Sequence, residues 1–291
     1  GSAGREGAAL QIGGGLGWSM GRLFRLDDKD MRLATLCGMS ALFSALFGTP
    51  LTATIFALEV ISVGVVYYSG LVPCLTAALA AYGVTRLFDV PPTAFAVAAP
   101  GLSAGLLWRV AVLGIACAAM SIVFCVVMHR GEHYIAKSLK NPYLRAAAGG
   151  FAIIGLTCLC GTTDYNGAGT AVISRAVTAG EAEPLAFALK LLFTAVTLGC
   201  GFRGGEVVPT FFIGATLGCV LGPLLGIPAG FAAAVGLVAL FCGAVNCPVA
   251  SVILAVELFG SGGIVYSAVA CAIAYMLSGY TGLYSSQKIM Y

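Results

Sequence analysis

The chain has 291 residues, of which 59% are hydrophobic and only 9% are charged. Soluble domains carry roughly 25% charged residues, so this composition excludes a protein with a water-covered surface. It also excludes intrinsic disorder, because so much apolar surface cannot stay unburied. The net charge of +3, without a basic run that alternates with aromatics, excludes a nucleic-acid surface. The sequence predicts a multi-pass protein of the cell membrane, surrounded by lipid, with room for about ten spanning segments.

Glycine and cysteine usage agrees with this class. The 40 glycines are about twice the average usage of roughly 7%, which fits helices packed backbone to backbone in lipid. The 11 cysteines lie mostly in apolar stretches and form no CxxC pair, so we expect small buried side chains. His129 and His133 lie at a charged boundary with no third ligand nearby. No metal site, cofactor or nucleophile–base set is predicted, and the protein is not expected to be an enzyme.

Charged clusters are expected to mark the loops between apolar segments. They occupy residues 22–32, 86–89, 130–145 and 181–183. The cluster at 130–145 has four Lys and Arg and only one acidic residue, which places it on the cytoplasmic side by the positive-inside rule. The predicted apolar helices cover residues 33–47, 50–68, 70–88, 106–128, 146–160, 185–201, 207–226, 229–245, 248–259 and 263–279. Several are shorter than the roughly 20 residues that cross a bilayer, which is typical of broken helices that end at a protein-lined cavity.

An internal repeat organises the chain. Residues 4–17 align with residues 205–218, and residues 47–59 align with residues 245–257 at nearly the same offset. Repeats whose broken helices meet at the bilayer midplane are a common transporter plan. We therefore predict an all-α, inverted-repeat fold with the later part of the first repeat in residues 1–140 and the second repeat in residues 141–291. Because the chain opens without Met inside a motif, we expect a preceding segment to be missing.

Both copies of the first motif place free N–H groups at a helix start. Gly4-Arg5-Glu6-Gly7 opens one apolar helix, and Gly204-Gly205-Glu206-Val207-Val208-Pro209 opens the other. The positive dipole end and the unpaired N–H groups favour an anion at such a position. Two facing N-termini predict an anion site without a fixed positive charge, so binding stays weak enough for release.

Carboxylates accompany both motifs. Glu6 is predicted to occupy the anion position itself and to leave it when protonated, although a plain helix cap remains an alternative. Glu206 occupies the equivalent turn. Glu59 and Glu257 end the two aligned Pro helices, and we expect them to be structural caps or loop contacts. The Tyr284 hydroxyl points either into a pore or toward the membrane interface.

Together these motifs resemble the CLC family of chloride channels and anion/proton antiporters. Gly4-Arg5-Glu6-Gly7 is similar to the gating-glutamate motif, with Ala8 where the family has Pro. Residues 204–209 and 282–285 are similar to the second pore signature and to the segment with the central tyrosine. The resemblance implies one pore in each subunit of a homodimer, which passes chloride or fluoride and protons. It makes Glu6 the gate and proton acceptor. It makes the N–H groups of Glu206 and Val207, with the Tyr284 hydroxyl, the ligands of the anion.

Departures from the family pattern leave the subclass open. Val60 stands where chloride/proton antiporters carry an internal proton-handling glutamate, as in channels and in the fluoride/proton branch. Glu206 is typical of the fluoride branch, but Val208 stands where that branch commonly has Thr. The serine-bearing loop of the family would precede Gly1. A non-transporting or degenerate subunit that lacks the first pore segment is the alternative function.

Overall fold

The structure is a computed structural model and describes residues 1–290. This part of the chain holds twelve α-helices and two short strands. The helices are α1 (Glu6–Leu23), α2 (Asp28–Phe47), α3 (Pro50–Glu59), α4 (Leu71–Leu87), α5 (Ala104–Ser138), α6 (Pro142–Cys160), α7 (Thr170–Ser174), α8 (Ala186–Gly199), α9 (Val207–Leu224), α10 (Ala229–Val245), α11 (Pro248–Phe259) and α12 (Ile264–Ser278). The strands β1 (Ser62–Val63) and β2 (Lys288–Ile289) pair in parallel.

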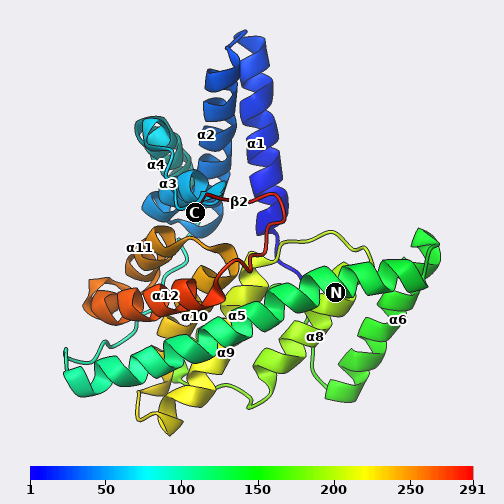
Figure 1. Cartoon of the computed structure of the whole chain (residues 1–291), viewed down its shortest axis with the longest axis vertical. Helices are drawn as coiled ribbons and strands as arrows, with labels where there is room; N and C mark the ends of the chain where they lie inside the picture. Colours follow the sequence, from blue (N-terminus) through cyan, green and yellow to red (C-terminus); the bar gives the residue numbers. More distant parts are fainter. Residues whose placement is uncertain (291) are drawn as a thin grey trace.

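The helices form a body and a projecting arm. In Figure 1, α1 and α2 stand side by side and project away from a body that contains α5, α8, α9, α10 and α12. α10 is buried along almost its whole length and forms the centre of the body. Six helices are long and apolar enough to cross a membrane: those at Asp28–Phe47, Tyr68–Leu87, Ala104–Ser138, Pro142–Cys160, Val207–Leu224 and Ser261–Ser278. These features confirm the prediction of an all-α, multi-pass membrane protein.

Local sequence signals fix several helix ends. The Asp27 carboxylate accepts hydrogen bonds from the N–H groups of Lys29 and Asp30, which caps the start of α2. The same helix ends at Gly48, whose φ of 72° is readily adopted by glycine. Prolines stand in the first turns of α3, α6 and α11, where no N–H is needed.

Glycines bring helix pairs into backbone contact. Gly13 of α1 faces the carbonyl of Gly38 in α2, and Gly214 of α9 faces the carbonyl of Gly236 in α10. A Cβ atom at any of these positions would overlap the partner backbone. The expected close packing through small residues is therefore present in both repeats.

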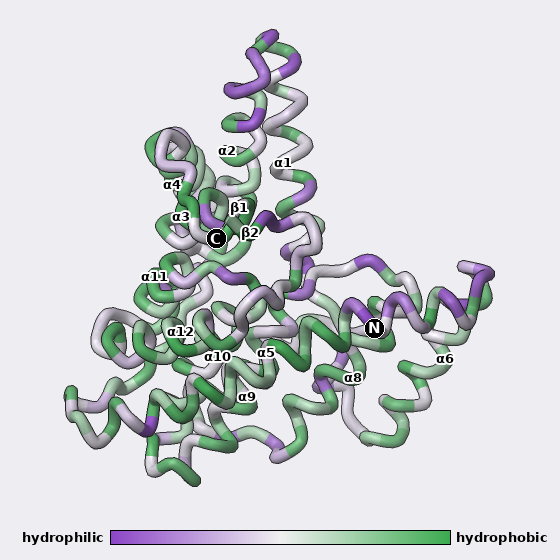
Figure 2. Tube along the Cα trace, in the orientation of Figure 1, coloured by the Kyte–Doolittle hydropathy of each residue, from purple (hydrophilic) through white to green (hydrophobic). Residues whose placement is uncertain are grey.

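The prediction of a loop at residues 130–145 is wrong for most of these residues, which are helical. Helix α5 continues through this charged stretch to Ser138, and only the short connection before Pro142 is irregular. Lys, Arg and Glu are good helix formers. A charged stretch therefore indicates a segment in contact with water, but it does not indicate where a helix ends. Figure 2 shows hydrophilic residues gathered at this end of α5 and at the tip of the α1–α2 pair. The predicted repeat boundary falls in the connection between α5 and α6, and it stays a prediction.

Candidate functional site

The two repeated motifs meet at their glycines. Gly4 donates its N–H to the carbonyl of Gly205 at 2.8 Å, and Gly205 donates its N–H to the carbonyl of Gly4 at 2.7 Å. This antiparallel bridge lies directly before the starts of α1 and α9. Residues that are equivalent in the repeat alignment are therefore joined to each other, and both helix N-termini converge on the same place.

The Glu6 carboxylate occupies that place. None of the Glu6 surface is exposed, and its Oε1 accepts a hydrogen bond from the N–H of Val208 at 2.9 Å. Oε2 has no hydrogen-bond partner among residues 1–290. The Oε1 atom therefore lies where a small anion would accept a hydrogen bond from the same N–H group at the start of α9. We call this position the Glu6 seat.

Glycine makes room for the carboxylate. A Cβ atom on Gly4 would overlap both carboxylate oxygens of Glu6, and one on Gly205 would overlap Oε1. A Cβ on Gly7 would lie 3.1 Å from the Gly205 Cα. The seat therefore requires glycine on both strands of the bridge because any side chain there would fill it.

Two cavities are lined by residues next to Glu6. The first, which we call the Tyr284 cavity, has a volume of about 580 Å³. It is lined by Gly7, Gly205, Glu206, Val207 and Tyr284, together with Leu10, Gln11, Met39, Phe56, Val60, Ile61, Gly204, Ser286 and Gln287. It brings together five of the residues that the sequence predicts to bind the anion.

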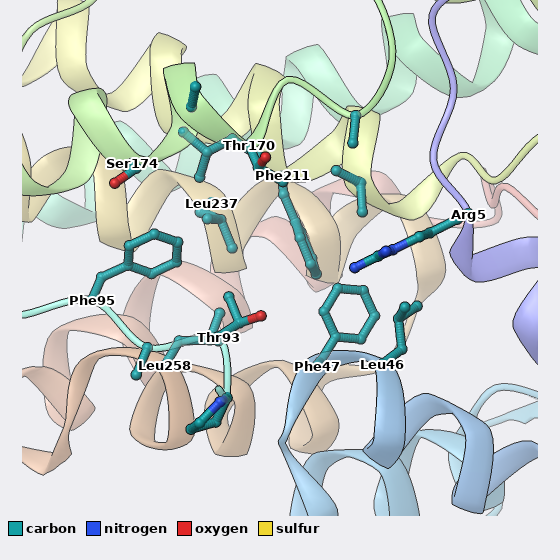
Figure 3. Close-up of a pocket in the computed structure, with 16 residues that line it drawn as sticks. Arg5, Leu46, Phe47, Thr93, Phe95, Thr170, Ser174, Phe211, Leu237 and Leu258 are labelled. Atoms are coloured by element: carbon teal, nitrogen blue, oxygen red, sulfur yellow. The ribbon is translucent and has the colours of Figure 1, made fainter. Parts of the chain in front are cut away.

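The second cavity, which we call the Arg5 cavity, has a volume of about 440 Å³. Its walls include Arg5 and Val208, so it approaches the Glu6 seat from a different side. Figure 3 shows the Arg5 side chain reaching into this cavity toward the rings of Phe47 and Phe211. The structure thus separates Arg5 from the other predicted anion ligands. Glu6 itself lines neither cavity, although its neighbours Arg5 and Gly7 line one cavity each.

Four features of the site differ from the sequence analysis or were absent from it. The hydrogen bond to Glu6 comes from the N–H group of Val208, for which the sequence analysis predicted no contact with Glu6. Gln287 was not singled out, although it follows Tyr284 by one turn and lines the same cavity. Lys190, which received no role, is fully buried, and its Nζ donates to the carbonyls of Tyr165 and Gly167. The Glu206 side chain forms no hydrogen bond with any described residue, and it is partly exposed to the Tyr284 cavity.

The expectation that Glu59 and Glu257 are caps is confirmed, with an arrangement that the sequence did not reveal. Glu59, at the end of α3, accepts hydrogen bonds from the N–H groups of Val249 and Ala250 at the start of α11. Glu257, near the end of α11, accepts them from Leu51 and Thr52 at the start of α3. Each Pro helix therefore caps the other, which repeats the symmetry of the glycine bridge.

Comparisons with known proteins agree with the motifs. The family model described as voltage gated chloride channel matches residues 1–279. A protein of Pseudomonas syringae pv. tomato named "Chloride/fluoride channel protein" is 37% identical over 297 residues, which cover 99% of this chain and 65% of the relative. The chain thus spans slightly less than two thirds of that relative. A relative of Ralstonia nicotianae, named "Putative chloride channel protein ClcB-like", is 27% identical over 97% of this chain and 68% of its own length.

Solved structures show the same architecture. The crystal structure of a CLC-type fluoride/proton antiporter matches with a TM-score of 0.96 and 32% identity, and covers all of this chain and 73% of the antiporter. A slow cyanobacterial Cl⁻/H⁺ antiporter matches with a TM-score of 0.79 at 20% identity, over 95% of this chain and 68% of its own. The fold and the paired helix N-termini define a multi-pass membrane protein with an inverted-repeat architecture. The chain belongs to the family of voltage-gated chloride channels, the CLC family.

Proposed function

We propose that the full-length protein transports halide ions across the cell membrane and that Glu6 is its gate. One observation carries the proposal: a fully buried carboxylate accepts a hydrogen bond from a backbone N–H group where two helix N-termini meet, and residues next to it line two cavities. A buried carboxylate is costly, and such residues are commonly functional inside membranes. Here the carboxylate takes the position of the transported anion.

Protonation drives the proposed cycle. The charged carboxylate competes with a halide for the Val208 N–H and for the positive ends of α1 and α9. A neutral carboxyl group binds this position more weakly and leaves it to the anion. Glu6 therefore accepts a proton from one side and exchanges places with the halide. In the Tyr284 cavity, the proposed ligands are the N–H groups of Glu206 and Val207 and the Tyr284 hydroxyl.

Fluoride is the halide that we propose, in exchange for protons. The proposal is supported by the 32% identity to a fluoride/proton antiporter and by Glu206 in the second motif. Val60 supports it as well, because a valine there supplies no second proton acceptor of the chloride/proton type. We further propose a homodimer with one pore in each subunit and the repeat division near residue 140.

Efflux from liposomes tests this function. The full-length protein is reconstituted, and fluoride, chloride and proton movements are recorded together. We expect fluoride efflux with opposing proton flow, and faster flux as pH falls because protonation frees the Glu6 seat. Glu6→Gln is expected to abolish proton flow and the pH dependence.

Glu183→Gln is the matched control, because Glu183 is exposed and far along the chain from both motifs. It should transport as the wild type does. Unchanged proton coupling and pH dependence in Glu6→Gln would contradict the proposed gate. Chloride efflux without protons in the wild type would instead identify a channel.

A further inference from the structure

Lys190 is a fully buried cation in the apolar helix α8. Its Nζ donates to the carbonyl of Gly167 at 2.8 Å and to that of Tyr165 at 3.1 Å, and it lies 4.9 Å from the centre of the Phe212 ring. Carbonyl oxygens and the face of an aromatic ring both favour the charged ammonium group. They carry only partial charges, however, so the full charge of Lys190 requires a counterion in this buried position.

No acidic group forms an ion pair with Lys190 in the described part of the chain. The one salt bridge among residues 1–290 joins Arg175 and Asp164. Glu6 is the acidic group of this part of the chain with which Lys190 interacts electrostatically. The two charges therefore attract each other across a gap, without a direct bond that would hold Glu6 in place.

Contacts with α9 place Lys190 near the Glu6 seat. The Phe212 ring that the ammonium group faces follows Val208 by one turn of α9. Val208 is the residue whose N–H group binds Glu6. Lys190 therefore lies close to the start of α9, where its charge adds to the positive end of the helix dipole.

Contacts with the N-terminal segment lead to the same place. Lys190, Thr194 and Thr197 follow one another at helical spacing, which puts them on one buried face of α8. Thr197 accepts a hydrogen bond from the N–H of Ser2 at 2.9 Å, and the hydroxyls of Thr194 and Ser2 lie 3.0 Å apart. Ser2 precedes Gly4 of the glycine bridge by two residues. This face of α8 therefore lies against the segment that leads into the Glu6 seat.

We propose that Lys190 is the fixed counter-charge of the Glu6 seat and keeps the seat occupied by one negative charge, either the Glu6 carboxylate or a halide. While Glu6 is charged, the two charges balance. When Glu6 takes up a proton, Lys190 is left without a counterion and favours entry of the halide. Because Lys190 acts across a gap, it strengthens the attraction without preventing release. Lys190 thereby sets the pH at which the seat opens, a role that rests on the proposed function of Glu6.

Other titratable groups also act on Glu6. The adjacent Arg5, Glu206 at the start of α9 and Tyr284 in the C-terminal segment interact with it electrostatically. Each of these three residues lines a cavity, whereas Lys190 is sealed from solvent. Buried charges are screened less than charges that meet water or ions. The variants that test Lys190 leave all three groups in place.

The pH dependence of fluoride efflux from liposomes tests this role in the full-length protein. Lys190→Met keeps a long side chain and removes the charge. Without that charge the Glu6 carboxylate is less stable and takes up its proton at higher pH, so the midpoint of the flux curve should rise by about one pH unit. Lys190→Arg and the exposed Lys140→Met should keep the wild-type midpoint. A purely structural role would lower the rate or the stability and leave the midpoint unchanged, and that result in Lys190→Met would overturn the proposal.

A second pair of variants keeps Lys190 and its two carbonyl contacts. Thr194→Glu places a carboxylate one turn from Lys190 on the same face of α8, and Thr194→Gln is its neutral match. Thr194→Glu should raise the midpoint as Lys190→Met does, whereas Thr194→Gln should not. Equal midpoints in the two Thr194 variants would contradict the counter-charge.

Infrared absorption by the protonated Glu6 carboxyl group separates this role from transport, because it requires no ion flow. Glu6→Gln removes the band and thereby identifies it. The pH midpoint of the band should rise in Lys190→Met by the same amount as the flux midpoint. If the wild type passes no halide, the proposed function fails, and the infrared midpoint still decides for or against Lys190. Halide flux together with an unshifted infrared midpoint in Lys190→Met would overturn the role of Lys190 and leave the proposed function standing.

Discussion

Glu6 is a fully buried carboxylate with only one of its two oxygens hydrogen-bonded within the described chain. Removing a charge from water is expensive unless other groups compensate for it. The compensation here comes from the Val208 N–H and from the positive ends of two helices. Because the compensation is incomplete, the proposed gate needs only a modest free energy to exchange the carboxylate for another anion.

A substitution in the glycine bridge tests the proposed gate without changing any charged group. Gly205→Ala introduces a methyl group that overlaps Glu6 Oε1 and lies 2.7 Å from the Gly7 nitrogen. We expect halide flux to fall by roughly tenfold or more, because the methyl group fills the Glu6 seat. The measurement is the initial efflux rate per folded protein. Gly150→Ala in α6 is the control, since a methyl group there would have no neighbouring atom within 4 Å, and it should retain wild-type flux.

The sequence predicted the charged and glycine residues of the site better than the directions of their side chains. Glu6 and Gly205 follow from a motif at a helix start, where dipole and N–H groups act locally. Arg5 belongs to the same motif as Glu6. Its side chain nevertheless lines a different cavity from the one that Glu206 and Tyr284 line. Its direction depends on Phe47 and Phe211, which come from distant parts of the chain, so no local pattern could have indicated it.

Helices α3 and α11 show how the repeat stabilises an element pair. Each has a proline in its first turn and a glutamate at or near its last residue. The glutamate of one helix binds two N–H groups at the start of the other. Four helix-end N–H groups are thereby satisfied, and the two short helices are held side by side.

Removal of either cap should destabilise the protein by an amount that depends on burial. Glu59 is 6% exposed and binds the buried N–H of Ala250. Glu257 binds the more exposed Leu51. We expect Glu59→Ala to lower the free energy of unfolding by about 2 kcal/mol and Glu257→Ala by about 1 kcal/mol. Thermal unfolding in detergent measures both, with Glu183→Ala as the control, and the reverse order would contradict the reciprocal caps.

Most helices could be predicted from the apolar stretches of the sequence, because a helix that crosses lipid must have a minimum length and an apolar composition. The charged C-terminal end of α5 was missed, since its helical structure depends on intrinsic propensity and not on apolarity. The short α7 and the π-helical turn at Arg175–Ala179 were also missed. Their backbone follows the packing of neighbouring helices, which no repeating pattern in the sequence records.

Across the whole molecule, the last residues tie the two halves together. Lys288 and Ile289 in β2 pair with Ser62 and Val63 in β1. Gln287 donates from Nε2 to the carbonyls of Val60 and Val245, each at 2.9 Å. Figure 1 shows the C-terminal segment crossing from the end of the body to the base of the α1–α2 arm. Tyr284 lies in this segment, so its position depends on contacts to both halves.

Gln287→Leu should loosen this segment without removing any proposed anion ligand. The substitution keeps a similar volume and removes the amide donor to the Val60 and Val245 carbonyls. We expect amide hydrogen exchange in residues 283–289 to rise by roughly tenfold, while exchange in α10 stays unchanged. Ser285→Ala, which alters an exposed side chain of the same segment, is the control. Equal exchange in Gln287→Leu and wild type would show that the strand pairing alone holds Tyr284.

The glycine bridge also bears on how such proteins diversify. The N–H group that holds Glu6 belongs to the main chain, and every substitution at Val208 short of proline keeps it. Mutations in the flanking side chains can therefore alter preference for one ion over another while the underlying contact persists. A lineage could exchange one substrate for a related one through single steps, each leaving a working protein.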